Sequence, residues 1–196
     1  RLESADETVG PLSGTGTVAL VSGAALGVNG FADAAFAGGI TGTGTVTKTG
    51  AAVQTLSGAL TFKGTIIVDA GVLNLQGATL TGVTNIVIRS SGELTGAATV
   101  SGNLTVTFEG GVYSGNLTVS GTLTVLGTVN LKRSAGALLP YSQTLFTYAS
   151  ADAPTRAALA AAVTQGVPFG YRAAVSVTDT SARLIVVPKI MVLLLK

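Results

Sequence analysis

Apolar and polar residues alternate along most of this chain in short stretches of about five residues. In SGNLTV, found at residues 101–106 and again at 114–119, Leu104 and Val106 fall on one face of an extended chain. The Asn and Thr between them fall on the other face. Thr, Val and Ile favour a pleated strand, and the glycine before each stretch permits a tight corner. The pattern predicts many short β-strands joined by corners.

These short strands belong to an internal repeat. The pentad Ser-Gly-x-Leu-Thr occurs at residues 57–61, 91–95, 101–105, 114–118 and 120–124. Strands of this length cannot each enclose a core, so they must stack on one another.

Two arrangements can stack such strands: a β-solenoid and an antiparallel sandwich. A sandwich usually uses hairpin turns such as Asn-Gly, and Asn29-Gly30 is the single Asn-Gly pair of the sequence. We therefore expect a right-handed parallel β-solenoid. With about 20–25 residues per coil and about 4.8 Å between strands, residues 12–131 would form five or six coils, roughly 25 Å tall.

Residues 41–77 carry a family resemblance. Their motifs are Lys48-Thr49-Gly50, Leu56-Ser57-Gly58, Phe62 followed by Gly64-Thr65, the strand Ile66-Ile67-Val68, and Ala70-Gly71-Val72-Leu73. This order resembles the autotransporter-associated β-strand repeat of bacterial surface proteins, and the likeness extends over residues 7–131. It implies a parallel β-helix within a secreted passenger. A self-secreting autotransporter ends in a membrane barrel domain, for which this chain has no room, so the resemblance implies another export route.

The repeat pattern ends at residue 131. We expect residues 1–131 to form the solenoid and residues 132–196 to form a small α/β cap, because an open solenoid end exposes unpaired strand edges. A helix is predicted at about residues 152–165, and residues 171–188 are predicted to form two strands. The helix signals are Asp152 as N-cap, Pro154 in the first turn and Gly166 at the end.

Composition removes several classes of chemistry. The 196 residues include no Cys and no His, so disulfides, thiolate or imidazole metal sites and His-activated nucleophiles are excluded. A net charge of +2 with 10% charged residues does not indicate nucleic-acid binding. The apolar segment 184–196 is shorter than the ~20 residues that span a bilayer and is broken by Pro188 and Lys189, so no membrane span is expected. We expect no cofactor.

Acidic residues offer the one route to catalysis. Some β-helix proteins cleave polysaccharides with paired carboxylates, and glycoside hydrolysis needs such a pair about 5–9 Å apart. Glu93 and Glu109 could lie on neighbouring coils. We expect them to be solvated corner residues, with no catalytic residue and no metal site in the chain.

Outward-facing threonines offer a binding alternative. Thr41, Thr43, Thr45, Thr47 and Thr49 alternate, and Thr105, Thr118 and Thr124 are expected in the same outward register. Such a ladder could hold a crystalline polysaccharide, although solvent-facing threonines are also common in ordinary strands.

The apolar C-terminal run suggests self-association, and its residues are Ile190, Met191, Val192, Leu193, Leu194 and Leu195. This run could complete the cap, pair with a neighbouring subunit by β-strand addition, or begin a sorting anchor. We expect a non-catalytic, extracellular or cell-surface fibre subunit whose partner is another copy of itself, joined head to tail. The alternatives are an adhesin module that binds surface glycans and an enzyme that acts on polysaccharide.

Overall fold

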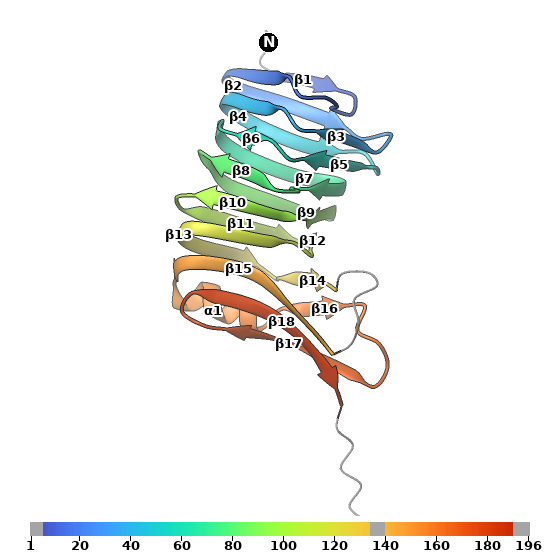
Figure 1. The fold of residues 1–196 in the computed structure, drawn as a ribbon, viewed down its shortest axis with the longest axis vertical. Coiled ribbons are helices and arrows are strands. Elements are labelled where there is room, and N and C mark those ends of the chain that lie inside the picture. The colour runs from blue at the N-terminus through green and yellow to red at the C-terminus, as the bar shows by residue number, and fades with distance from the viewer. Residues whose placement is uncertain (1–5, 134–139, 190–196) are drawn as a thin grey trace, which may run out of the picture.

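The computed structural model describes residues 6–133 and 140–189 of the chain. Its strands wind into a parallel β-solenoid of about six turns, with a helix and an antiparallel strand pair at the C-terminal end (Figure 1). The predicted fold class is confirmed.

Each coil contributes strands to three faces, which we name A, B and C in chain order. Face A holds the first parts of β2 (Thr17–Asn29) and β4 (Gly39–Thr49), then β6 (Ala59–Leu60), β8 (Ala78–Thr81), β10 (Ala97–Ser101) and the first part of β13 (Asn116–Gly127). Face B holds β1 (Asp6–Val9), the second parts of β2, β4 and β13, and the first parts of β7 (Lys63–Asn74) and β9 (Val83–Thr95), with β11 (Leu104–Glu109). Face C holds β3 (Ala34–Phe36), β5 (Val53–Leu56), the second parts of β7 and β9, β12 (Val112–Tyr113), β14 (Asn130–Lys132) and β16 (Val163–Gln165).

The coil length is constant through the middle of the stack. On face B, Thr45 pairs with Thr65, Thr65 with Asn85, and Asn85 with Thr105, so equivalent positions lie 20 residues apart. This spacing lies within the range predicted from the sequence. Because side chains alternate between the two sides of a strand, a constant offset stacks like positions directly above one another.

The core consists of inward columns, one side chain from each coil. The face A column is Ile40, Leu60, Leu80, Val100 and Val119, and the face B column is Leu26, Val46, Ile66, Ile86, Val106 and Val125. All of these side chains are buried. Each buried aliphatic side chain contributes about 1.5–3 kcal/mol relative to exposure, so the columns supply the main driving force for stacking.

The Ser-Gly-x-Leu-Thr pentad marks corners on all three faces. Residues 57–61 and 114–118 lead into face A, residues 101–105 and 120–124 into face B, and residues 91–95 lie on face C. Its glycine lets successive coils approach closely. At Gly58, an added Cβ would lie 2.0 Å from the carbonyl oxygen of Gly38 on the coil above.

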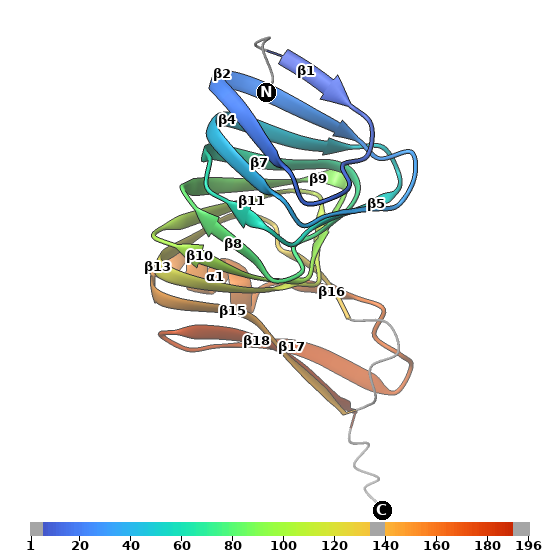
Figure 2. The ribbon, with the colours of Figure 1, turned by 45° about the horizontal axis from the view of Figure 1, so that its top comes forward.

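The C-terminal end of the stack is closed by β15 (Tyr141–Ala151), α1 (Ala153–Ala160), β17 (Tyr171–Val177) and β18 (Ser181–Pro188). β15 continues the parallel stack by pairing with β13, and β18 then pairs with β15 in the antiparallel direction. β17 and β18 are the two strands predicted within residues 171–188. Figure 2 shows β1 at one end of the molecule and β17 with β18 at the other.

The predicted helix at 152–165 is correct at its start and wrong at its end. Asp152 caps it, accepting a hydrogen bond from the Thr155 backbone N–H at 2.8 Å, but the helix ends at Ala160. Residues 163–165 instead form β16, which pairs with β14 on face C. The open edge of β14 offers ladder hydrogen bonds to Val163 and Thr164, whose β-branched side chains favour a strand over a helix.

Candidate functional site

The predicted self-association residues, Ile190, Met191, Val192, Leu193, Leu194 and Leu195, lie outside the described residues. The described chain ends at Lys189, whose backbone N–H donates to the carbonyl oxygen of Gly170 at 2.7 Å. The surfaces that bear on end-to-end association are therefore the two ends of the described stack.

At the C-terminal end, α1 covers face B. The buried Thr155 side chain accepts a hydrogen bond from the Val125 backbone N–H, with 3.0 Å between nitrogen and Oγ1, and Leu159 of the same helix is fully buried. The hydroxyl supplies the acceptor that the next coil would otherwise provide. Hydrogen bonds from Thr155 lower the pKa of the capping Asp152. The helix therefore forms a lid over the last coil on face B.

Below face A the stack ends in an edge strand, β17. It reaches the face A register at Val177, and its residues 173–175 lie in register with residues 141–143 of β15, ahead of face A. β15 is parallel to β13, β18 is antiparallel to β15, and β17 is antiparallel to β18. Two reversals restore the original direction, so β17 runs the same way as the coil strands of face A. Figure 1 shows the arrowheads of β8, β10 and β17 on the same side of the molecule. Among the described strands, only β18 pairs with β17.

The N-terminal end also presents strand edges. β1 pairs with the second part of β2, and the first part of β2 pairs with β4. Within residues 6–133 and 140–189, no further strand pairs with β1 or with residues 17–20 on their other side. This end therefore offers a face A strand edge that points away from the rest of the stack.

The two ends carry opposite charge. Residues 6–62 contain three acidic residues and one lysine, a net charge of −2, whereas residues 140–189 contain four basic and two acidic residues, a net charge of +2. The acidic residues of the N-terminal part are Asp6, Glu7 and Asp33, and the basic residues of the C-terminal part are Arg156, Arg172, Arg183 and Lys189. Oppositely charged ends favour head-to-tail encounter of two copies.

The two carboxylates considered for catalysis belong to different ion pairs. Arg89 bridges three coils, with contacts of 3.0 Å to Asp69 and 3.3 Å to Glu109 at the end of face B. Glu93 lies on face C, where it binds Lys132 at 2.7 Å and accepts a hydrogen bond from the Ser114 hydroxyl at 3.0 Å. The structure thus gives each carboxylate a partner from another coil and does not bring Glu93 and Glu109 together.

The outward threonines form two columns rather than one. Thr105 and Thr124 pair on face B, in line with Thr45 and Thr65, whereas Thr118 lies on face A. The expected common register is therefore wrong for Thr41 and Thr118, because a corner separates the two halves of β4 and of β13. The face A column is Thr79, Thr99, Thr118 and Thr147, all exposed.

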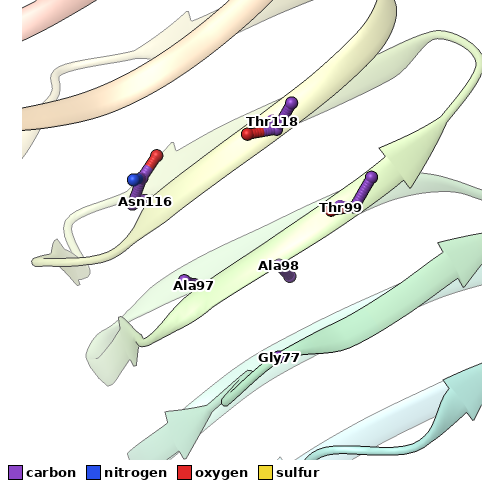
Figure 3. A pocket seen from close by; sticks show the side chains of 6 residues that line it. All are labelled: Gly77, Ala97, Ala98, Thr99, Asn116 and Thr118. Atoms are coloured by element: carbon purple, nitrogen blue, oxygen red, sulfur yellow. The ribbon is translucent and has the colours of Figure 1, made fainter.

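A shallow groove of about 140 Å³ runs beside the face A threonine column. Gly77, Ala97 and Asn116 occupy the neighbouring outward position on successive coils, and the small size of the first two leaves the hollow (Figure 3). The Asn116 side-chain oxygen is buried and accepts no hydrogen bond within the described part of the chain. The polar side chains that line the groove are Thr99, Asn116 and Thr118.

Besides Thr155, two buried polar side chains of the described residues were not predicted from the sequence. Lys48 occupies the inward position between Val28 and Val68, and its ammonium donates to the carbonyl oxygens of Thr49, Gly50 and Ala70 at 2.7, 2.8 and 3.1 Å. Only 1% of its surface is exposed, and burial lowers its pKa. The sequence contains a signal for this inward position, because Lys48 lies 20 residues before Val68, which is one coil length, and therefore occupies the equivalent place in its own coil.

The second buried polar side chain is Gln54, with 1% of its surface exposed. Its side-chain oxygen accepts from the Leu12 backbone N–H and its nitrogen donates to the Leu12 carbonyl oxygen, both at 2.9 Å. Both residues satisfy backbone groups inside the stack. Their contacts indicate a structural role.

The described residues hold no group of three acidic side chains arranged to bind a metal ion, and none of their helices is long and apolar enough to cross a membrane. Comparison of the chain with protein families, curated proteins and solved structures returns no match.

Proposed function

We propose that this chain is a non-catalytic structural protein of the bacterial surface or extracellular space that associates end to end into fibres. The observation that carries the proposal is the pair of strand edges at opposite ends of one stack, on β2 and on β17, which are unpaired among the described strands. An exposed, unprotected strand edge is a template for pairing with another chain. Contacts between different ends of identical subunits propagate instead of closing.

The remaining surface supports a structural role. The face A column and the face B column of the core are apolar, and Arg89 pairs between coils with Asp69 and Glu109. The likeness of residues 41–77 to a repeat of bacterial surface proteins supports placement outside the cell.

Electron microscopy of negatively stained protein, with sedimentation velocity, tests the proposal. The full chain is compared with a variant that lacks residues 190–196. Fibres from the full chain and single particles from the variant would support a joint made by the apolar tail. Fibres from both would support association through the described strand edges. Monomers from both, at all concentrations, would overturn end-to-end association.

A second candidate function is glycan binding by an adhesin-type module, favoured by the groove between Asn116 and the exposed threonine column of face A. Screening on a glycan array tests it, with Ala97→Phe as the variant. A phenylalanine at this outward position would fill the groove without entering the core. Retained binding by this variant would exclude the groove as the glycan site.

A further inference from the structure

We infer that the joint between two copies is a parallel pairing of β17 of one copy with residues 17–20 of β2 of the next, so that the β-sheet continues from one molecule into the other. This inference rests on the proposed end-to-end association and names the strands that make it.

Strand direction is the first support. A parallel solenoid can be continued only by a strand that runs the same way as its coils. β17 meets this condition because β18 runs antiparallel to β15, and β17 in turn runs antiparallel to β18. The first part of β2 is itself a face A coil strand, parallel to β4. A second copy stacked with the same polarity therefore presents β2 to β17 in the parallel orientation found between all coils of the stack.

The backbone groups on the edge of β17 are the second support. The Thr178 backbone N–H donates to Ser181 at 2.8 Å and the Gly170 carbonyl oxygen accepts from Lys189 at 2.7 Å, so even-numbered residues direct their amides toward β18. In an antiparallel ladder the alternate residues face the other way. The N–H and C=O groups of Ala173 and Val175 therefore point to the free edge.

The same reasoning identifies the groups on β2. The Gly39 backbone N–H donates to the Gly16 carbonyl oxygen at 3.1 Å, so residues 16, 18 and 20 face β4. Thr17 and Ala19 consequently direct their amides away from the stack. Each end thus offers two residues whose donors and acceptors match those of a parallel ladder.

Charge and exposed apolar surface are the third support. β17 contains no proline and no lysine, the residues that commonly protect an edge, and its one charged residue is the exposed Arg172. The end that it would meet holds Asp6 and Glu7 on β1. Phe169, two residues before β17, is 105% exposed, and Val163 on β16 is 53% exposed. A second copy of this chain supplies both the acidic complement and the cover for these side chains.

The test uses two proline variants of the full chain. Ala173→Pro removes an outward N–H from β17, and Ala19→Pro removes one from β2; a proline whose N–H faced solvent is tolerated in an edge strand. Ala173→Ser and Ala19→Ser keep the N–H and serve as matched controls. Circular dichroism and thermal unfolding show that each variant folds, and sedimentation velocity gives the size distribution of each.

We expect each proline variant alone to remain monomeric, with association at least tenfold weaker than in the serine controls. An equimolar mixture of the two should form dimers and nothing larger, because the mixture contains one intact joint per pair. Arg172→Glu, at an exposed position, should also weaken association at least tenfold while leaving the fold unchanged.

Two results would separate this inference from the proposed function. If the full chain forms fibres and both proline variants do so equally well, the strand pairing is wrong and end-to-end association stands, through the tail. If the full chain stays monomeric at every concentration, both are overturned. Dimers or fibres from Ala173→Pro alone would also contradict the pairing, since that variant lacks one half of the joint.

Discussion

The side chain of Gln54 forms a two-way hydrogen-bonded pair with the backbone of Leu12, which lies 42 residues earlier in the chain. Ala34 lies on the coil between them and pairs with Gln54 through β3 and β5, and its small side chain leaves room for the glutamine to reach upward inside the stack. The glutamine thus fixes the segment between β1 and β2 from within. This contact holds the N-terminal edge of the stack in place.

Replacing Gln54 with methionine should loosen that edge. The backbone N–H and C=O of Leu12 would lose their partners, at a cost of about 1–3 kcal/mol in unfolding free energy. Hydrogen exchange measured by mass spectrometry should show faster exchange across residues 10–16 than in the wild type. Gln76→Met, at an exposed position, is the matched control and should leave exchange unchanged. Equal exchange in the Gln54 variant would show that the pair does not fix this segment.

The contact between Thr155 and Val125 should determine the stability of the lid. Thr155→Val keeps the shape of the side chain but leaves the buried Val125 N–H without an acceptor, so we expect a loss of about 1–3 kcal/mol in urea unfolding. Thr155→Ser keeps the oxygen and should lose clearly less. A valine variant as stable as the serine variant would mean that water or another group satisfies the Val125 N–H.

Lys48 should make stability depend on pH at the alkaline end. Burial lowers its pKa below the usual 10.5, so between the lowered value and 10.5 the unfolded chain binds more protons than the folded one. The contribution of this group to unfolding free energy therefore rises with pH in that window. Urea unfolding of the wild type and Lys48→Met at several pH values measures this contribution. The methionine variant should lack the rise, whereas the exposed-site control Lys63→Met should keep it.

Gly38 should tolerate no side chain. An added Cβ would lie 1.8 Å from the carbonyl oxygen of Gly16, a backbone atom that also accepts the hydrogen bond from Gly39. Gly38→Ala must therefore separate two coils, and we expect a loss of about 1–3 kcal/mol or more in thermal or urea unfolding. Gly16→Ala is the matched control, because a Cβ there meets nothing within 4 Å. The control should be neutral, and equal losses in both variants would point to a general backbone effect.

The sequence predicts the stack well because its signals are local. Alternation within each strand determines which side chains enter the core, as with Leu104 and Val106, and a glycine corner follows or precedes nearly every strand. The 20-residue coil length lies within the predicted range, since the same motif elements recur along the chain.

The face on which a repeat lies could not be predicted from the motif. The two copies of SGNLTV at 101–106 and 114–119 are identical in sequence, yet Thr105 lies on face B and Thr118 on face A. The face on which each copy lies depends on the number of residues in the corners of its coil. This number is a property of the whole coil and cannot be read from the motif alone. The end of the predicted helix was missed for a similar reason, because β16 forms only where β14 offers its edge.

The constant 20-residue offset has a consequence for how such a chain can change in length. Thr65 and Asn85 occupy the same position on successive coils, so excision of residues 65–84 would join Gly64 directly to an equivalent point one layer further along. The rod would shorten by about 4.8 Å, while the segment fixed by Gln54 at one end and the lid at the other would keep their own neighbours. Whole layers of 20 residues can therefore be removed or added while the pairing at both ends is kept, so the length of the rod varies independently of its two ends.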